Sequence, residues 1–494
     1  MNLVLSPANF LFPKTPLLPL SHPPRPSCKT PHKTLKPRAV QLESYPPPAS
    51  DPPRRSDTGV LVIGAGLAGL AAATRLHASK IPFLLLEASD AVGGRVRTDT
   101  VDGFLLDRGF QIFITAYPEA RKTLDYEALD LQKFYSGALV YSNGRFHTVS
   151  DPFRHFPDAL KSLANPIGSV FDKLLIGAVR LRAVSRSDDE ILTAEEIPII
   201  ELLRKTGFSD SIIDQFFRPF FGGIFFDRQL ETTSRLFHFI LKCLALGDNT
   251  LPAKGISSIP EQLAGKLPPD SVRLNSKVVS VDFANESEPP RVILQTGEIL
   301  GGESGLIVAV EEPVAEKLLE GKIDKKPAGK AARGTACLYF SADRSPVRKP
   351  VLILNGSGTG IVNNMFFATD VAPSYAPEGK TLVSISVVGS CEDVPDEELT
   401  RVVIRELSGW YGTEVVESWK HLRTYRIGFA QPNQSPPTDL VRKRPGIGSG
   451  VYVCGDYRNS ATFDGALVSG RRAAEALLKD RESFIKDRGL ARVI

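Results

Sequence analysis

The stretch from residue 60 to residue 98 constrains the fold more than any other part of this chain. It opens with a short apolar run at 60–63, which is typical of a buried parallel strand. Gly64, Gly66 and Gly69 follow in a GxGxxG spacing and lead into a helical run. Strand, glycines and helix in this order predict a β-α-β unit that binds a dinucleotide.

Each glycine has a separate physical role in such a unit. Gly64 allows the tight turn, Gly66 lets a pyrophosphate approach the backbone, and Gly69 lets the helix pack closely on the strand. The backbone N–H groups where the helix starts, at Leu67 and Ala68, and the partial positive charge there favour phosphate.

A second apolar strand, at 83–86, ends at Glu87 and Ala88. An acid at this distance from the glycines accepts hydrogen bonds from ribose hydroxyls. Gly93, Gly94 and Arg95 come next, and a glycine pair with a cation suits a second phosphate or a ribityl chain.

This GxGxxG…E…GGR…T pattern resembles the superfamily of flavin-dependent amine oxidases and phytoene desaturases. The resemblance implies FAD as the cofactor and assigns the backbone of Val278 to the adenine. The superfamily's closing signature is a strand followed by Gly-Asp, a loop and Gly-Ala-x-x-Ser-Gly. It is matched here by Gly455, Asp456, Gly465 and Ala466. Helix N–H groups at 465–466 are expected to stabilise negative charge on a reduced flavin.

Composition indicates a globular protein, with 42% hydrophobic and 23% charged residues. The net charge is +4, but the first fifty residues hold six Lys or Arg and only one acid. The rest of the chain is therefore close to neutral and lacks the excess of basic residues that is typical of nucleic-acid-binding proteins. Five scattered cysteines without a CxxC pair argue against disulfides or a metal site and favour a reducing compartment. No apolar run reaches the roughly 20 residues of a membrane-spanning helix.

Residues 1–53 have no acid before Glu43 and are rich in proline, hydroxyl and basic residues. Prolines interrupt the apolar core that a secretory signal needs, so this leader is interpreted as a transit peptide. It lacks the Arg-rich amphipathic helix of mitochondrial leaders, which favours a plastid, with the mitochondrion or a disordered linker as alternatives.

The predicted fold is α/β: an FAD-binding, Rossmann-like three-layer domain with a mixed α+β substrate domain. Thr193 and Glu196 form a capping-box pattern, which predicts a helix from there to Gly207. The FAD-binding domain is expected to comprise 56–115, 251–335 and 425–494. The substrate domain is expected to comprise 116–250, mainly helical, and 336–424.

Three features bear on the substrate. The run GFQIFITAYPEARKTL is similar to plant-type phytoene and zeta-carotene desaturases. Six phenylalanines lie within 216–226, where they could be domain core, the wall of a tunnel or a membrane patch. Amine-oxidising members carry a lysine beside the flavin on a later strand, and Ala336 is aligned with it here.

These features favour an oxidoreductase of the desaturase type. It would pass hydride from an isoprenoid- or tetrapyrrole-like substrate to flavin N5, and an unknown acceptor such as a quinone or oxygen would reoxidise the flavin. An amine oxidase, a carotenoid-type isomerase and a non-catalytic flavin-binding protein are the alternatives. No catalytic acid or base is predicted, and peripheral membrane contact is left open.

Overall fold

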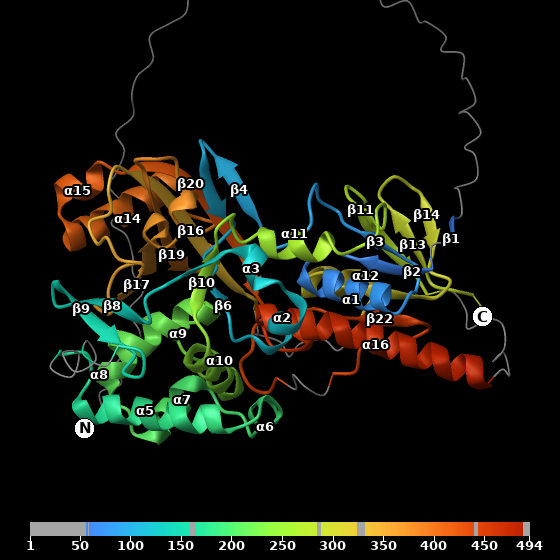
Figure 1. Ribbon diagram of the computed structural model, residues 1–494, viewed down its shortest axis with the longest axis horizontal. Coiled ribbons are helices and arrows are strands. Elements are labelled where there is room, and N and C mark those ends of the chain that lie inside the picture. Colours follow the sequence, from blue (N-terminus) through green and yellow to red (C-terminus); the bar gives the residue numbers. More distant parts are fainter. Residues whose placement is uncertain are drawn as a thin grey trace, which may run out of the picture. The chain divides into compact units, whose positions relative to one another are not determined.

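Two sheets organise the protein (Figure 1). All the residues described below belong to one compact unit, Pro52–Ile494, and the expected leader at 1–53 lies outside them. The computed structural model describes residues 56–57, 59–155, 157, 165–283, 288–323, 331–438 and 443–487.

The first sheet has six strands and is parallel except for β21. It draws its strands from distant parts of the chain, and its central strands β2 and β15 are buried along their whole length, as expected for strands covered on both faces. The strands, in order across the sheet, are β11 (Val272–Arg273), β3 (Phe83–Leu86), β2 (Val60–Ile63), β15 (Gly305–Val308), β22 (Val451–Val453) and β21 (Gly446–Gly448).

Alternate side chains of β2 and β15 pack on opposite faces of this sheet. Val60, Val62 and Ile307 contact α1 (Leu67–Ala78) and α16 (Phe463–Asp487), which pack against each other. The opposite-facing residues of these strands pack against α12 and a four-stranded sheet. This layer consists of α12 (Glu312–Leu318), β1 (Ser56–Asp57), β12 (Val278–Asp282), β13 (Arg291–Leu294) and β14 (Ile299–Gly301). The three-layer α/β prediction is confirmed.

The second sheet has seven strands, and all neighbours are antiparallel except β17 and β8. Its strands 137–142 and 145–150 fall inside the segment expected to be mainly helical. The expected domain boundary at 424–425 falls inside β20. The strands, in order, are β20 (Lys420–Gln431), β16 (Arg333–Ala342), β19 (Thr381–Val388), β18 (Val362–Phe367), β17 (Leu352–Asn355), β8 (Gly137–Ser142) and β9 (Arg145–Ser150).

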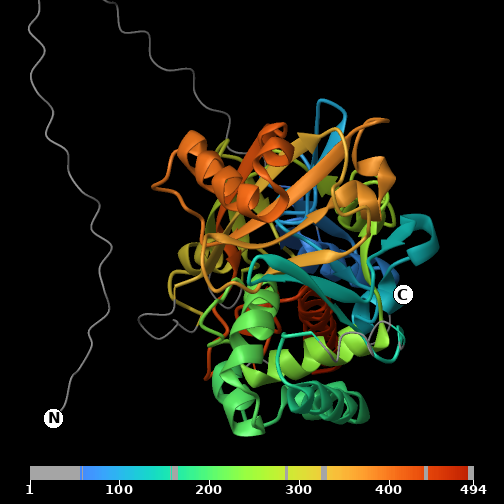
Figure 2. The ribbon, with the colours of Figure 1, turned by 90° about the vertical axis from the view of Figure 1, so that its left-hand side faces the viewer.

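Helices cover both faces of the seven-stranded sheet (Figure 2). One face packs against α14 (Asp396–Tyr411) and α15 (Thr413–Glu417). The helices on the other side are α5 (Val170–Ser185), α6 (Asp188–Leu192), α7 (Ile199–Thr206), α8 (Asp210–Ile212), a π-helical turn (Ile213–Phe217), α9 (Arg218–Phe225) and α10 (Ser234–Leu246).

Shorter elements lie between the main strands and helices along the chain. They are β4 (Thr98–Val101), β5 (Phe104–Asp107), β6 (Phe113–Ile114), α2 (Pro118–Thr123), α3 (Tyr126–Leu129), β7 (Leu131–Lys133), β10 (Asn249–Pro252), α11 (Ser258–Ala264), α13 (Ala368–Val371) and two 3-10 turns, Pro373–Tyr375 and Asp456–Arg458.

The capping-box prediction at Thr193 is wrong. Thr193 ends α6, and the next helix, α7, begins only at Ile199, after Pro198. The carboxylate of Glu196 accepts hydrogen bonds from the Thr233 hydroxyl and the Thr438 backbone N–H, so tertiary contacts take the place of a local cap. The predicted helix end at Gly207 is confirmed, because Gly207 has φ 96° as its C-cap.

Candidate functional site

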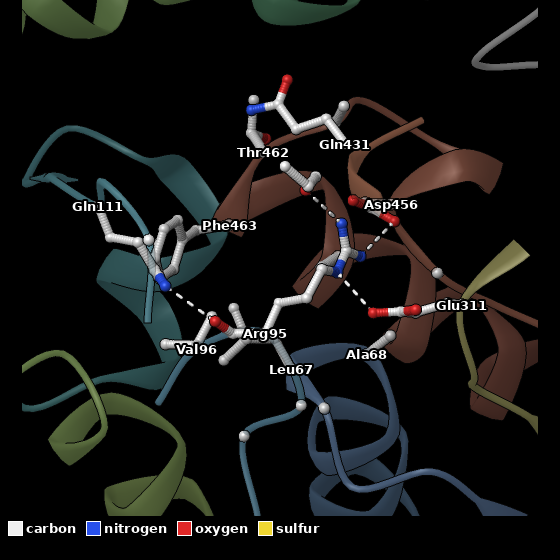
Figure 3. A pocket seen from close by; sticks show the side chains of 18 of the residues that line it. Leu67, Ala68, Arg95, Val96, Gln111, Glu311, Gln431, Asp456, Thr462 and Phe463 are labelled. Atoms are coloured by element: carbon white, nitrogen blue, oxygen red, sulfur yellow. Dashed lines mark hydrogen bonds and ion pairs between the residues drawn. The ribbon is translucent and has the colours of Figure 1, made fainter. Parts of the chain in front are cut away.

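A cavity of about 540 Å³ extends from the first glycine loop to α9 and α10. This volume lies within the range of small-molecule and cofactor sites. Its wall draws on the loop after β2, on the segment 93–96, on β12 and on the residues that follow β15 and β22 (Figure 3). Chain segments almost 400 residues apart therefore meet at one site.

The glycine loop leaves open space where a ligand would lie. Gly66 has φ −72° and ψ 179°, an extended conformation that any residue can adopt. A Cβ built on it would meet only the Gly93 carbonyl oxygen, at 4.0 Å. The backbone conformation at position 66 therefore does not require glycine. What glycine provides there is empty space above the loop.

Gly64 and Gly69 serve the loop itself. Gly64 has φ +96°, and a Cβ there would lie 2.8 Å from the Ala309 carbonyl oxygen. A Cβ on Gly69 would lie 1.8 Å from the Gly64 carbonyl oxygen, so Gly69 allows α1 to pack against the turn. Together with the twelve-residue helix α1, this arrangement suits a ligand that carries a diphosphate.

The Glu87 carboxylate lies beside the loop and is 8% exposed. One oxygen accepts a hydrogen bond of 2.7 Å from the Ala65 N–H, and the other accepts from the N–H and hydroxyl of Ser89. The loop thereby holds the acid at the end of β3, where the sequence predicts a partner for ribose hydroxyls.

We expect Glu87→Ala to weaken FAD binding about ten- to a hundredfold, because a buried charged acceptor is lost and the Ala65 N–H loses its partner. Isothermal titration of the apoprotein with FAD measures the change. Glu87→Gln keeps the volume and one acceptor oxygen, and we expect it to lie between the wild type and Glu87→Ala. Unchanged affinity in Glu87→Ala would show that the acid is structural only.

Arg95 crosses the end of the cavity that lies next to the glycine loop (Figure 3). Its Nη2 lies 2.9 Å from Asp456 Oδ1, its Nε lies 3.3 Å from Glu311 Oε1, and its Nη1 donates to the Ala430 carbonyl at 2.8 Å. The guanidinium is thus held next to the glycine loop by carboxylates from two other strand ends.

The structure brings together the predicted cofactor residues except Gly69 and Gly465, which do not line the cavity. A Cβ on Gly465 would lie 2.0 Å from the Ser460 carbonyl oxygen, so Gly465 lets the preceding turn fold against α16. The residues that line the cavity are Gly64, Gly66, Leu67, Ala68, Glu87, Ala88, Gly94, Arg95, Val278, Gly455, Asp456 and Ala466.

The other end of the cavity is mainly apolar. The phenylalanine cluster divides there: Phe217, Phe221 and Phe225 are core residues, whereas Phe220 and Phe226 face the cavity. The core interpretation is therefore confirmed for three members, and the tunnel-wall interpretation stays a prediction for the two that line the cavity. Other apolar lining residues are Phe110, Ile112, Ile114, Tyr117, Ile224, Ile240, Leu244, Leu352, Ile427 and Phe463.

A few uncharged polar groups interrupt this wall, and sequence reasoning did not select any of them. Gln111 donates from Nε2 to the Arg95 carbonyl at 2.8 Å, and Gln431 donates to the Ile224 carbonyl at 2.9 Å. Gln111 lies in the run GFQIFITAYPEARKTL, whose similarity to plant-type desaturases was a usable signal. Asn364 also lines the cavity, but no sequence pattern pointed to it.

The alignment of Ala336 with the lysine position needs correction. Thr335 of β16 lines the cavity, whereas Ala336 is fully buried on the opposite face of the strand with Leu338. Successive side chains of a strand point to opposite faces, so a shift of one residue changes the face. Lys277 is the only lysine among the described lining residues, and it adjoins Val278.

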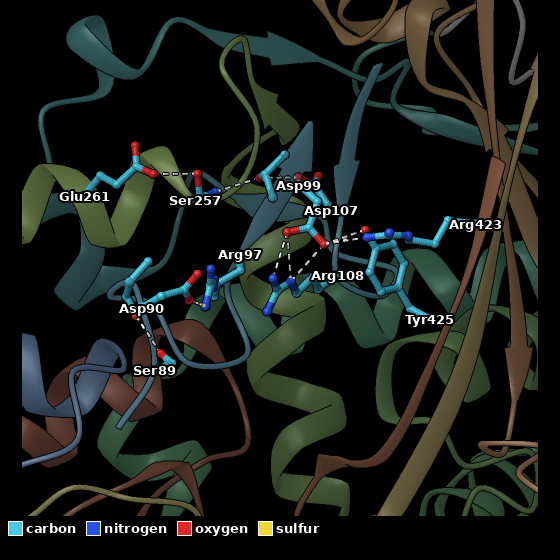
Figure 4. A network of polar contacts seen from close by, with 12 residues as sticks. Ser89, Asp90, Arg97, Asp99, Asp107, Arg108, Ser257, Glu261, Arg423 and Tyr425 are labelled. Carbon is cyan, nitrogen blue, oxygen red and sulfur yellow. Dashed lines mark hydrogen bonds and ion pairs between the residues drawn. The ribbon is translucent and has the colours of Figure 1, made fainter. Parts of the chain in front are cut away.

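Arg108 also lines the cavity, and its charge is already paired. Its guanidinium donates to both carboxylate oxygens of Asp99, at 2.8–3.1 Å (Figure 4). Asp99 also accepts from the Tyr425 hydroxyl at 2.7 Å, and these contacts hold the pKa of its carboxyl below the ordinary value.

Asp107 lies in a buried network behind this pair (Figure 4). Its Oδ1 accepts from the Thr98 hydroxyl at 2.7 Å and from the Ile256 N–H at 3.0 Å, and its Oδ2 accepts from the Tyr375 hydroxyl at 3.0 Å. Burial raises the pKa of Asp107 from 3.8 to about 6, although the hydrogen bonds oppose the rise.

This shift predicts a pH dependence of stability. Because the folded protein binds the Asp107 proton more tightly than the unfolded chain does, the group adds to the unfolding free energy at low pH. This contribution is fully present below the unfolded pKa of 3.8 and is lost as the pH rises through about 6. Relative to Asp107→Asn, which keeps the shape, the wild type should lose about 2–3 kcal/mol of unfolding free energy across that window. Urea unfolding of both proteins over this range measures it. Parallel profiles would mean that Asp107 does not titrate there.

The described residues contain no cluster of His, Cys, Asp and Glu suited to a metal ion. Cys243, Cys337, Cys391 and Cys454 are free thiols, and burial raises the pKa of Cys337 to about 12. None of the described helices is both long and apolar enough to span a bilayer.

Comparison with known proteins matches residues 67–478 to the family described as "Flavin containing amine oxidoreductase". The chain is 21% identical over 478 residues to a chloroplastic/chromoplastic 15-cis-phytoene desaturase of Capsicum annuum, covering 86% of this chain and 78% of the relative. It is 23% identical over 474 residues to coproporphyrinogen III oxidase of Bacillus subtilis, covering 83% and 94%. Among solved structures, wild-type putrescine oxidase bound to putrescine has a TM-score of 0.63 at 17% identity, covering 86% of this chain and all of that one.

Proposed function

Because the chain belongs to the flavin-containing amine oxidoreductase family, we propose that it is an FAD-dependent oxidoreductase that desaturates an uncharged, apolar substrate of isoprenoid type. Its being a flavin-dependent oxidoreductase follows from the family. The substrate class and the desaturation are the proposal, and the character of the cavity wall carries them. FAD, when bound, accepts a hydride from a substrate carbon at N5.

The cofactor residues divide the cavity into two ends. The glycine loop, Glu87 and Arg95 would hold the dinucleotide, and the start of α16 would face the flavin. Helix N–H groups at that position favour negative charge on a reduced cofactor. The remaining wall, formed by α9, α10 and the ends of β16 and β20, would receive the substrate.

Charge is the feature that selects the substrate class. The charged lining residues other than Arg108 are Glu87, Arg95, Lys277, Glu311 and Asp456, all next to the dinucleotide residues. Arg108 is paired with Asp99. Moving an unpaired ammonium or carboxylate into the apolar end would cost several kcal/mol, so a diamine or a polycarboxylate tetrapyrrole fits poorly. A neutral hydrocarbon-like molecule loses nothing there and gains by burial.

The apolar wall also serves the chemistry. A wall of Phe220, Phe226, Ile224 and their neighbours excludes water from the substrate, which limits side reactions of the reduced cofactor. Formation of the double bond also releases a proton from the neighbouring carbon. No described side chain is placed as a base at this end, so this proton would pass to the reduced cofactor or to a water molecule. The glutamines and Asn364 can orient a substrate without ionising.

Anaerobic reduction of the FAD-loaded protein tests the proposal. The substrates named for the three relatives form a natural panel: 15-cis-phytoene in detergent micelles, putrescine and coproporphyrinogen III. We expect loss of the visible flavin absorbance with the isoprenoid alone. Reduction by putrescine would establish an amine oxidase, and reduction by the porphyrinogen alone would move the substrate class to tetrapyrroles. We also propose a plastid location, which the chloroplastic relatives support.

A further inference from the structure

A β-bulge in β18 turns two neighbouring asparagines toward the same helix. The partners of β18 on β19 shift between Val362 and Asn364, so Asn363 is an extra residue in the strand. Successive side chains of a regular strand point to opposite faces, whereas a bulge re-aims one of them. Both amides consequently face α9: a Cβ built on Gly223 would lie 2.8 Å from Asn363 Nδ2 and 3.2 Å from Asn364 Nδ2.

Hydrogen bonds fix the direction in which both amides point. Asn363 Nδ2 donates to the Pro219 carbonyl of α9 at 2.9 Å and to Asn364 Oδ1 at 3.1 Å. A carbonyl oxygen can only accept, so the atom of Asn363 that faces Pro219 must be the nitrogen. The oxygen of Asn364 must in turn face that nitrogen, which leaves the two N–H donors of Asn364 Nδ2. The orientation of Asn364 therefore follows from the fold and does not depend on a ligand.

The donors of Asn364 are unused although the side chain is buried. The residue is 3% exposed and lines the cavity. Among the described residues, none accepts a hydrogen bond from Asn364 Nδ2. By contrast Gln111, another amide of the wall, donates from Nε2 to the carbonyls of Arg95 and Arg108. A buried amide donor without an acceptor is unfavourable, so Asn364 favours a ligand that brings an acceptor into the cavity.

A purely structural role does not explain the asparagine pair. Asn363 Oδ1 is buried without a hydrogen-bond partner in the described part of the chain. Two leucines would fill a similar volume without leaving that oxygen and the Asn364 donors unpaired. Bulges of this kind are frequent next to active sites, where they redirect a side chain. The arrangement therefore carries a cost in stability that a ligand on Asn364 Nδ2 partly offsets.

We propose that Asn364 selects a substrate with a neutral carbonyl oxygen, which accepts a hydrogen bond from Nδ2. The proposal deepens the proposed function and rests on it for the isoprenoid character of the substrate. A carboxylate fits poorly: apart from Arg108, which is paired with Asp99, the charged lining residues lie next to the predicted cofactor residues. A hydroxyl would bring a hydrogen of its own, whereas the Asn364 oxygen already accepts from Asn363. A ketone or aldehyde supplies only the acceptor that is missing.

This donor distinguishes a carbonyl-bearing isoprenoid from a pure hydrocarbon. Sites that present a buried hydrogen-bonding group discriminate against analogues that lack the partner, because the group then stays unpaired. One such hydrogen bond corresponds to about a ten- to hundredfold difference in affinity. A hydrocarbon such as 15-cis-phytoene binds without using Asn364, whereas an isoprenoid ketone gains this contact.

Isothermal titration of the full-length, FAD-loaded protein with two matched ligands tests the proposal. One ligand is geranylacetone, an isoprenoid ketone, and the other is its hydrocarbon analogue, in which =CH2 replaces =O. The measured quantity is the ratio of the hydrocarbon to the ketone dissociation constant. Comparing this ratio between proteins cancels the different hydration of the two ligands. We expect Asn364→Leu, which is close in volume, to lower the ratio about ten- to a hundredfold and to bind the hydrocarbon at least as tightly as the wild type does.

A second variant tests the orientation of the amide. Asn363→Leu keeps Asn364 but removes the N–H that orients it, so the ratio should fall severalfold, and less than in Asn364→Leu. One FAD per chain and retained hydrocarbon binding show that a variant is folded. An unchanged ratio in either folded variant would overturn this proposal and leave the proposed function standing. Failure of the wild type to bind either ligand would overturn both, because the apolar end would then not receive an isoprenoid.

Discussion

Gly66→Val is expected to abolish FAD binding in a protein that remains folded. The backbone at Gly66 is extended and so accepts valine, and the nearest protein atom to a new Cβ is 4.0 Å away. The side chain would instead fill the space above the loop, where the diphosphate approaches the backbone. We expect the affinity to fall more than about a hundredfold, or about 2.7 kcal/mol, with little change in the unfolding temperature of the apoprotein.

The measurement is FAD content after desalting, together with thermal unfolding of both apoproteins. Gly69→Val is the informative comparison, because its Cβ would overlap the Gly64 carbonyl oxygen. We expect that variant to lose stability and FAD together. Stoichiometric FAD in Gly66→Val would remove the cofactor assignment of the loop.

Gly470→Ala is expected to have the largest effect on stability. Gly470 lies within α16, and a Cβ there would sit 1.9 Å from the Ala68 carbonyl oxygen in the first turn of α1. Because the contact is with a backbone atom, which cannot rotate away, α16 and α1 would have to move apart at this point. We expect a loss of about 3 kcal/mol or more in unfolding free energy, as for other overpacked sites.

Gly409→Ala is the matched control for this prediction. Gly409 is also within a helix, α14, but a Cβ at this position would meet no atom of a neighbouring element within 4 Å, so alanine should stabilise the protein by about 0.5–1 kcal/mol. Urea unfolding of both variants gives the comparison. If Gly470→Ala behaved like Gly409→Ala, the close contact between α1 and α16 would be absent in solution.

Local sequence order predicted the strand-loop-helix geometry around the glycines well. The strand, the glycine loop, the helix and Glu87 lie within one short stretch, so their geometry depends little on distant contacts. The closing Gly455-Asp456 motif was placed at the same site through its resemblance to a superfamily signature, and the structure puts it beside Arg95.

The substrate end could not be predicted to the same degree, because it depends on which face of an element is turned inward. A π-helical turn at Ile213–Phe217 precedes α9 and changes the angular phase of the phenylalanines that follow. On β16, a one-residue difference separates Thr335 in the cavity from Ala336 in the core. At Glu196, hydrogen bonds to Thr233 and Thr438 replaced a local cap that the sequence pattern favoured.

Stoichiometric turnover tests the proposed desaturation most directly. The FAD-loaded protein would be incubated anaerobically with 15-cis-phytoene and a short-chain quinone, and the product would be analysed by mass spectrometry while quinol is quantified. We expect a product lighter by two hydrogens, with one quinol formed for each new double bond. A product of unchanged mass formed without quinol would identify an isomerase, and an unchanged substrate in a protein that holds FAD would contradict the assignment of the apolar end to an isoprenoid.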